Sequence, residues 1–185
     1  MNEDGHVVFM DRVGDLVELA CGDKLAPQSV ESRLRFSPYI RDAWVFTGPK
    51  REYASAIIII HYVNVGRWAG QRRVAYNTFA ELSQKPEVYE LVAQEIDRIN
   101  SSLSAGSRLK KYVNLHKEFD PEEGEITRTR KLRRAVLKER YRELIDAIYA
   151  DKTEVPIEVQ IKHQDGRTES TRTTLRIKSL KGVAL

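Results

Sequence analysis

The sequence predicts an α+β protein with a small central antiparallel three-stranded sheet flanked by helices, an N-terminal two-stranded hairpin and a C-terminal β-hairpin extension. Runs rich in β-branched and aromatic residues predict the strands. Two longer segments repeat apolar residues with the 3.6-residue period of a helix. A segment near the C-terminus alternates apolar and polar residues around an Asp-Gly pair, which predicts the final hairpin. We find no internal repeat or low-complexity segment.

The composition fits one globular protein. Of the 185 residues, 41% are hydrophobic and 31% are charged, so a real core can form. The net charge of +4 and the pI near 9.1 leave a polyanionic partner open. With one cysteine, Cys21, and no apolar leader, we expect a cytoplasmic setting, with attachment to a membrane surface left open. The most apolar run, residues 56–60, is far shorter than the roughly 20 residues that cross a bilayer.

The N-terminal part predicts a connector followed by a small hairpin. Residues 1–15 show no period and contain a charged segment broken by a glycine, so we expect a connector. Residues 16–19 and 24–26 are short strand-like pieces on either side of Gly22. Gly22 can adopt the positive φ that a tight turn requires.

A short helix is expected next. Pro27 suits its first turn, Val30 and Leu34 recur at i and i+4, and Pro38 ends it. Glu31 is interpreted as serving helix solubility or local pairing.

Three central strands follow. Residues 43–47 and 53–63 flank a turn at 48–51 and predict an antiparallel pair, with the isoleucine run 57–60 in a central strand. Residues 109–115 predict the third strand.

The helices of the central part differ in the strength of their patterns. Residues 68–82 are weakly helical, whereas Pro86 opens a strongly periodic helix. Residues 135–149 form a second strong pattern, with one apolar and one basic face. Trp44 and Trp68 are interpreted as core aromatics. The apolar positions of the helix after Pro86 are Val88, Val92, Ile96, Ile99 and Leu103.

The C-terminal segment predicts a β-hairpin. Residues 157–161 alternate apolar and polar side chains, and residues 175–177 continue the alternation after the Asp-Gly pair at 165–166.

Three residues stand apart from the core pattern: Arg12 in the connector, Gly22 in the first hairpin, and Lys131 in a Gly-Glu-x-Thr-x-Thr-x-Lys run. Their order within longer motifs is specific. The motifs are DRVGDL at 11–16, Gly22, PQSVE at 27–31 and GEITRTRKLRR at 124–134. Together they resemble the C-terminal domain of the adenylate-forming enzyme family, over residues 11 to about 150.

The helical stretch 68–103, with YNTFAEL at 76–82, resembles the long-chain acyl-CoA synthetase branch of that family. The resemblance implies the lid domain of an AMP-forming long-chain fatty-acid–CoA ligase. Residues 1–15 would be the connector and hinge from a missing N-terminal domain, and residues 16–150 the lid. Residues 151–185 would be a β-hairpin extension without an assigned role.

In such an enzyme, ATP and a fatty acid give acyl-adenylate and pyrophosphate, and the thiol of coenzyme A then displaces AMP. Lys131 matches the catalytic lysine that places a cation between the carboxylate and the α-phosphate. Arg12 matches the arginine that contacts the nucleotide. Gly14 takes the hinge position, where the family usually has Asp or Lys, so we expect a looser hinge. Gly22 matches the turn that lines the coenzyme A tunnel.

The resemblance also implies the cofactors and partners. The full-length enzyme would use ATP/AMP, coenzyme A and Mg²⁺, with none bound to this fragment, and the adenylation domain of the same polypeptide would be the partner. Without a phosphate-binding loop of its own, the fragment should be inactive alone. His6, His61, His116 and His163 lie far from metal-ligand spacing, so no metal site is expected in the chain.

Two other functions remain as alternatives. A basic nucleic-acid-binding module is suggested by the cations of residues 128–142, although this segment lacks interleaved aromatics and known recognition motifs. A non-catalytic interaction module could offer an edge strand of the C-terminal hairpin to a partner.

Overall fold

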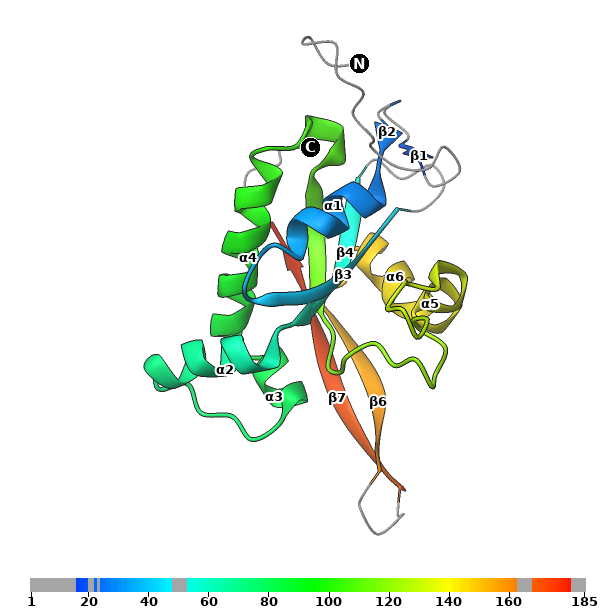
Figure 1. The fold of residues 1–185 in the computed structure, drawn as a ribbon. Helices are drawn as coiled ribbons and strands as arrows, with labels where there is room; N and C mark the ends of the chain where they lie inside the picture. The colour runs from blue at the N-terminus through cyan, green and yellow to red at the C-terminus, as the bar shows by residue number, and fades with distance from the viewer. Residues whose placement is uncertain (1–15, 20–21, 23, 48–52, 163–167, 181–185) are drawn as a thin grey trace.

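The computed structural model describes residues 16–19, 22, 24–47, 53–162 and 168–180 (Figure 1). The helices are α1 (Pro27–Leu34), α2 (Tyr62–Gln71), α3 (Phe79–Ser83), α4 (Pro86–Asn100), α5 (Arg134–Arg140) and α6 (Arg142–Tyr149). The strands are β1 (Val17–Glu18), β2 (Lys24–Leu25), β3 (Ile40–Phe46), β4 (Ala54–Ile60), β5 (Leu109–Asn114), β6 (Glu154–Lys162) and β7 (Thr168–Ser179). The predicted turns at 48–51 and 165–166 lie outside the described residues, as does Cys21.

The α+β class and the N-terminal hairpin are confirmed. Strands β1 and β2 pair antiparallel, with Val17 opposite Leu25, and form a sheet of their own. The larger sheet has five strands in the order β3-β4-β5-β7-β6.

Two details of the predicted sheet are wrong. Strand β5 runs parallel to β4, because the chain leaves the end of β4, crosses one face of the sheet through α2, α3 and α4, and returns to the end of the sheet at which β4 begins. The C-terminal hairpin does not stand apart from the central sheet. Its strand β7 pairs antiparallel with β5, with Val113 opposite Ile177, and leaves β6 as an edge strand.

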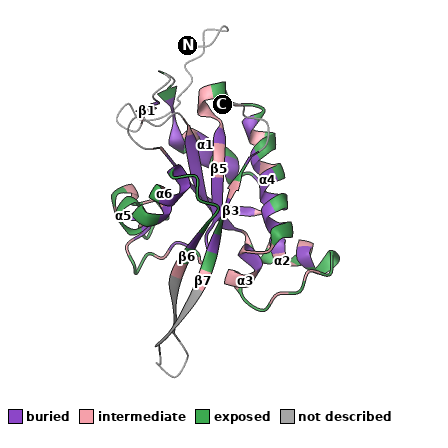
Figure 2. Ribbon diagram, turned by 180° about the vertical axis from the view of Figure 1, so that it is seen from behind, coloured by how far each residue is buried: buried purple, intermediate pink, exposed green. Residues whose placement is uncertain are grey.

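The central strand β4 separates two hydrophobic clusters. Ala54, Ala56, Ile58 and Ile60 face the first cluster, which is covered by α1 to α4. The intervening Ile57 and Ile59 face the second, which is covered by α5 and α6 (Figure 2). Because strand side chains alternate between faces, a run that is apolar throughout is buried on both sides.

The boundaries of the predicted helices differ from those observed. The strand predicted to reach residue 63 ends at Ile60, because His61 caps the N-terminus of α2 and its Nδ1 accepts a hydrogen bond from the Asn64 amide at 3.5 Å. The weak pattern at 68–82 corresponds to the end of α2 and to α3. The helix predicted over 135–149 is divided at Tyr141, whose φ of −98° and ψ of 20° interrupt the regular helix.

No helix among the described residues combines the length and apolar character that crossing a bilayer requires.

Candidate functional site

Lys131 lies on a tight loop that its neighbours close. The backbones of Ile126 and Leu132 form an isolated antiparallel bridge. Inside it, the Thr127 amide donates to the Lys131 carbonyl at 2.8 Å, and the Lys131 amide donates to Thr127 Oγ1 at 3.0 Å. Thr127 Oγ1 also lies 3.0 Å from Thr129 Oγ1. The Thr-x-Thr part of the motif therefore fixes the backbone that presents the lysine.

A buried ion pair fastens the end of this loop. Arg134 donates from Nη1 to Glu31 Oε1 and from Nη2 to Glu31 Oε2, both at 2.8 Å. Glu31 is only 3% exposed and also accepts a hydrogen bond from the Val45 amide at 2.9 Å. Burial raises the pKa of Glu31, although Arg134 opposes the rise. The interpretation of Glu31 as a solubility or local-pairing residue is wrong, because its partner lies far away in sequence.

A second carboxylate approaches the loop from β3. Asp42 is 3% exposed, and its carboxylate lies 3.8 Å from Arg130 Nη2 and 3.6 Å from Arg35 Nη1. Burial raises the pKa of Asp42. Arg130 has a φ of 59°, a left-handed conformation that is uncommon for a residue with a side chain. The ion pair with Asp42 stabilises the turn that contains this conformation.

Glu125 is the buried centre of the motif's first half. Its carboxylate is fully buried and accepts from Tyr141 Oη at 2.6 Å, the Asp120 amide at 2.8 Å, Arg140 at 3.0 Å and Lys117 at 3.2 Å. Burial alone would raise its pKa, but these donors outweigh burial and lower it. Glu125 is therefore held ionised where the loop begins.

Gly124 is favoured by the shape of its backbone. Its φ is +75°, which side chains rarely permit. A Cβ there would lie 3.0 Å from Nη1 of Arg133, whose amide donates to the Glu125 carbonyl at 2.9 Å. The Gly-Glu pair therefore lets the two ends of the loop approach closely.

Lys131 differs from the residues that hold its loop. Its side chain is exposed and forms no hydrogen bond or ion pair with any residue in the described part of the chain. The loop thus presents an unpaired ammonium on a backbone that hydrogen bonds hold in place, an arrangement suited to a negatively charged ligand.

Of the other predicted site residues, only Gly22 lies among the residues that the structure describes. Arg12 and Gly14 lie outside the described residues. Gly22 is exposed in the β1–β2 turn, with a φ of +83° and no atom within 4 Å of a Cβ built on it. In Figures 1 and 2 that hairpin lies above α5, the helix that follows the Lys131 loop, and on the same side of the view.

The residues that hold the loop were missed by sequence reasoning, with one recoverable signal. Pro27, Val30, Glu31 and Leu34 are all buried and share one face of α1 at i, i+3, i+4 and i+7. A carboxylate on an apolar face needs a partner, so this spacing could have identified Glu31. Glu125 belongs to the Gly-Glu-x-Thr motif, but no apolar periodicity around Glu125 or Asp42 indicates that these carboxylates are buried.

The basic segment does not present its cations uniformly to solvent. Three of its arginines, Arg130, Arg134 and Arg140, approach the buried carboxylates Asp42, Glu31 and Glu125. These cations stabilise the protein's own loop, which weakens the case for a nucleic-acid-binding face. In the described ranges, no group of three or more His, Cys, Asp or Glu side chains could hold a metal ion.

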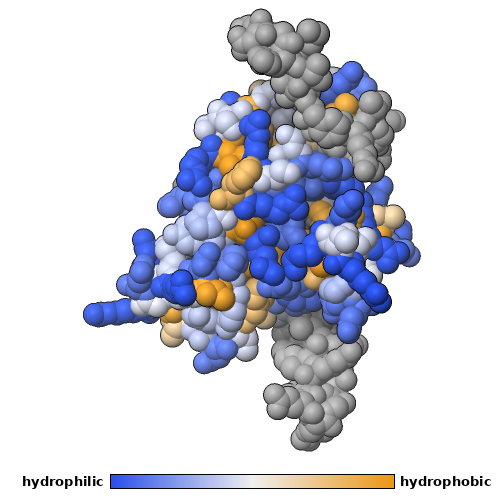
Figure 3. All heavy atoms as spheres, in the orientation of Figure 1, coloured by the Kyte–Doolittle hydropathy of each residue, from blue (hydrophilic) through white to orange (hydrophobic). Residues whose placement is uncertain are grey.

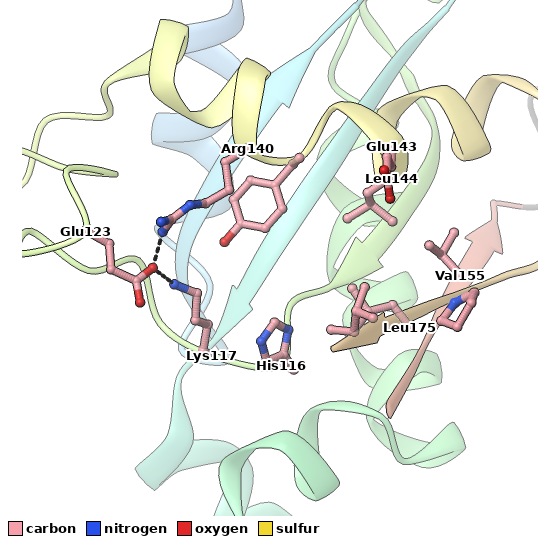
Figure 4. Close-up of a pocket in the computed structure, with 11 residues that line it drawn as sticks. His116, Lys117, Glu123, Arg140, Glu143, Leu144, Val155 and Leu175 are labelled. Carbon is pink, nitrogen blue, oxygen red and sulfur yellow. Dashed lines mark hydrogen bonds and ion pairs between the residues drawn. The ribbon is translucent and has the colours of Figure 1, made fainter. Parts of the chain in front are cut away.

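A cleft of about 610 Å³ is lined in part by Lys117, Arg140 and Tyr141, the side chains that donate to Glu125 (Figure 4). Lys131 does not line it. The His116 ring lies at this cleft, and its Nδ1 has no hydrogen-bond partner in the part of the chain that the structure describes. Burial and the neighbouring Lys117 lower the pKa of His116 to about 4. The lining residues are His116, Lys117, Glu123, Arg140, Tyr141, Glu143, Leu144, Val155, Pro156, Ile157 and Leu175.

Comparison with known proteins shows which family and which solved structures the chain resembles. The model of the family described as AMP-binding enzyme C-terminal domain matches residues 14–153. Long chain acyl-CoA synthetase 8 of Arabidopsis thaliana is 27% identical over 149 residues, which cover 80% of this chain and 21% of the relative. The long-chain-fatty-acid–CoA ligase FadD15 of Mycobacterium tuberculosis is 27% identical over 150 residues, which cover 80% of this chain and 25% of the relative. The chain thus spans a quarter or less of the length of these relatives.

Solved structures agree on the fold. The adenylation domain of a carboxylate reductase from Mycobacterium chelonae has a TM-score of 0.63 at 25% identity, covering 79% of this chain and 21% of that one. The adenylation–PCP didomain of a carboxylic acid reductase from Segniliparus rugosus, in complex with AMP, has a TM-score of 0.60 at 20% identity. It covers 77% of this chain and 18% of that one, and supports the fold alone.

Proposed function

The chain belongs to the family of AMP-binding enzyme C-terminal domains, and we propose that it is the lid domain of a long-chain fatty-acid–CoA ligase. The observation that carries the proposal is the unpaired, exposed Lys131 on a loop whose arginines Arg130 and Arg134 pair with the buried carboxylates of Asp42 and Glu31. The curated relatives named above support the choice of acid and thiol substrates.

Lys131 acts in the first half-reaction. A fatty-acid carboxylate must approach an α-phosphate that is already negative, and an ammonium between them lowers the repulsion as charge develops in the transition state. Removing one such preorganised donor typically costs about 10² to 10³ in rate. The hydrogen-bonded backbone of the loop supports this role, because a fixed starting point reduces the reorganisation needed to reach the nucleotide.

The remaining site assignments rest on the family motif. Arg12 would donate paired hydrogen bonds to ribose or phosphate oxygens of ATP/AMP. Gly14 would be the hinge on which the lid turns between the two half-reactions. Gly22 would then line the tunnel for the pantetheine arm of coenzyme A, and its exposure and lack of a side chain suit a surface along which a narrow thiol arm passes.

The proposed division of the chain follows the same motif. Residues 1–15 would connect the lid to the adenylation domain, residues 16–150 would form the lid, and residues 151–185 would extend it through the β5–β7 pairing. ATP, a fatty acid and coenzyme A would be substrates. In the part of the chain that the structure describes, no group of three or more His, Cys, Asp or Glu side chains could hold Mg²⁺, so the ion would be held by the adenylation domain.

The test uses the polypeptide in which this chain is joined to an adenylation domain. It should form acyl-CoA and release AMP from ATP, coenzyme A and a long-chain fatty acid. Lys131→Ala should lower this overall rate by roughly 10² or more, whereas Lys138→Ala, an exposed lysine on α5, should leave it unchanged. The 185-residue chain alone should exchange no pyrophosphate into ATP. Turnover by the isolated chain, or equal rates for the two lysine variants, would contradict the proposal.

A further inference from the structure

A basic patch covers the outer side and far end of α2. We define it as Arg67, Trp68, Arg72 and Arg73. All three arginines are exposed, and none forms an ion pair with any residue that the structure describes. The sequence from His61 to residue 80 contains no Asp or Glu, so no acidic neighbour along the chain neutralises them. Figure 3 shows hydrophilic side chains projecting at this corner of the molecule, with hydrophobic surface beside them.

Apolar and aromatic groups lie within and beside the patch. Trp68, interpreted above as a core aromatic, is only partly buried, and the guanidinium carbon of Arg72 lies 4.5 Å from its ring centroid. Val63 is 54% exposed and precedes Arg67 by one helical turn, so both lie on the outer face of α2. The patch therefore combines unpaired guanidinium groups with an indole and an exposed aliphatic side chain.

The packing of α2 keeps this patch turned outward. Val65 and Ala69 on its inner face are buried in the first hydrophobic cluster. Gly66 fits closely against Tyr76, since a Cβ at Gly66 would overlap the tyrosine hydroxyl. Asn64 Nδ2 donates to the Pro38 carbonyl at 2.7 Å. These contacts leave α2 little freedom to turn its arginines inward.

We propose that this basic patch docks on a membrane surface that contains anionic phospholipids. Guanidinium groups pair well with phosphate oxygens, and each basic residue near an anionic leaflet contributes attraction. Tryptophan is enriched at membrane–water interfaces, where its ring meets the headgroups. The biological use rests on the proposed function, because long-chain fatty acids partition into bilayers and a ligase that docks there meets its substrate.

The geometry favours a lipid surface over nucleic acid. In Figures 1 and 2, α2 lies at an outer corner of the molecule, a shape that a flat membrane can contact. Sequence-independent binding of single strands uses a groove with aromatic rings free to stack on bases. Here the ring of Trp68 is already stacked by Arg72. Helices α5 and α6 lie on the opposite side of the sheet, so docking leaves the Lys131 loop accessible.

Sedimentation of the 185-residue chain with vesicles tests the proposal. The probes are vesicles of phosphatidylcholine alone and vesicles in which roughly a third of the lipid is phosphatidylserine. We compare wild type with the triple variant Arg67→Gln, Arg72→Gln, Arg73→Gln. The matched control is Lys138→Gln, Arg142→Gln, Lys152→Gln, which removes the same charge from the other side of the sheet.

Each basic residue near the surface is worth about fivefold in binding, so the arginine variant should bind anionic vesicles about 100-fold more weakly than wild type. The control should lose less than about threefold. With Trp44→Phe in place, Trp68 emission should shift to the blue when the anionic vesicles are added.

Equal weakening in both triple variants would reduce the effect to net charge and overturn the proposal. If the chain bound single-stranded DNA more tightly than the vesicles, and the arginine variant lost that binding, nucleic acid would be the ligand of the patch and the lipid proposal would be overturned. A chain that binds neither the phosphatidylcholine vesicles nor those with phosphatidylserine would also refute the proposal. The assay contains no ATP or coenzyme A, so its outcome is independent of whether Lys131 is catalytic.

Discussion

Arg134→Ala tests whether the ion pair with the buried Glu31 holds the Lys131 loop. Two guanidinium nitrogens contact Glu31 at 2.8 Å, and Glu31 is 3% exposed. Breaking a buried pair on one side costs roughly 3–5 kcal/mol, because a charge is left buried without its partner. The Arg134 side chain is 31% exposed, and the Glu31 carboxyl that has lost its partner can take up a proton. We therefore expect a loss of roughly 2–3 kcal/mol in the free energy of unfolding at neutral pH.

The loss should depend on pH in a defined direction. Burial already raises the pKa of Glu31 from 4.5, and Arg134 opposes that rise. Without Arg134, the pKa of Glu31 in the folded chain rises further. Glu31 then releases its proton at a lower pH in the unfolded chain than in the folded chain. The variant then loses stability as pH rises between the two pKa values. Its destabilisation relative to wild type should be smaller near about pH 5 than near about pH 8.

The assay is urea unfolding of the 185-residue chain, followed by the fluorescence of the buried Trp44. The double variant Glu31→Gln, Arg134→Ala is the internal control, because a neutral amide removes the unpaired charge. It should be more stable than Arg134→Ala alone by about 1 kcal/mol at the higher pH. A loss below about 0.5 kcal/mol that does not change with pH, or strictly additive effects of the two substitutions, would refute the account of this ion pair.

Three further predictions concern the framework around the loop. Gly124→Ala should destabilise the chain by roughly 1–2 kcal/mol, because residue 124 has a positive φ. The matched Gly70→Ala in α2 should stabilise the chain slightly. Equal effects of the two substitutions in urea unfolding would contradict this prediction. Tyr141→Phe removes a 2.6 Å hydrogen bond to the buried Glu125 and should cost roughly 1.5–3 kcal/mol, and a change within about 0.5 kcal/mol would show that Glu125 does not need it. His116 has a pKa lowered to about 4, so the unfolded chain binds more protons below the ordinary pKa of 6.5 and stability should fall as pH decreases between these values. His116→Gln should flatten that dependence, and an unchanged profile would rule His116 out as its source.

Elements with strong local patterns were predictable from the sequence. The 3.6-residue period after Pro86 and the unbroken isoleucine run of β4 each depend on burial that a short segment records by itself. The direction of β5 was not predictable in this way. Its parallel pairing follows from where α2 to α4 cross the sheet, and that path is set by tertiary packing.

In the candidate site, too, a local motif could be recognised in the sequence, whereas contacts between distant residues could not. Lys131 was singled out through its motif, and its catalytic role stays a prediction; the structure shows that its side chain is exposed. The carboxylates that fasten the loop were not identified, since Glu31 and Asp42 meet their arginines only after the chain has folded. Gly124 could be understood only from its φ and from the position of Arg133.

The two half-reactions, measured separately in the polypeptide that joins this chain to an adenylation domain, test the role of Lys131 most directly. Pyrophosphate exchange reports acyl-adenylate formation, and thioester formation is followed from supplied acyl-adenylate and coenzyme A. For Lys131→Ala we expect adenylation to fall by about 10² to 10³ while thioester formation stays within about threefold of wild type; Gly22→Leu should show the reverse. Equal losses in both half-reactions for Lys131→Ala would contradict the assignment of this lysine to adenylation.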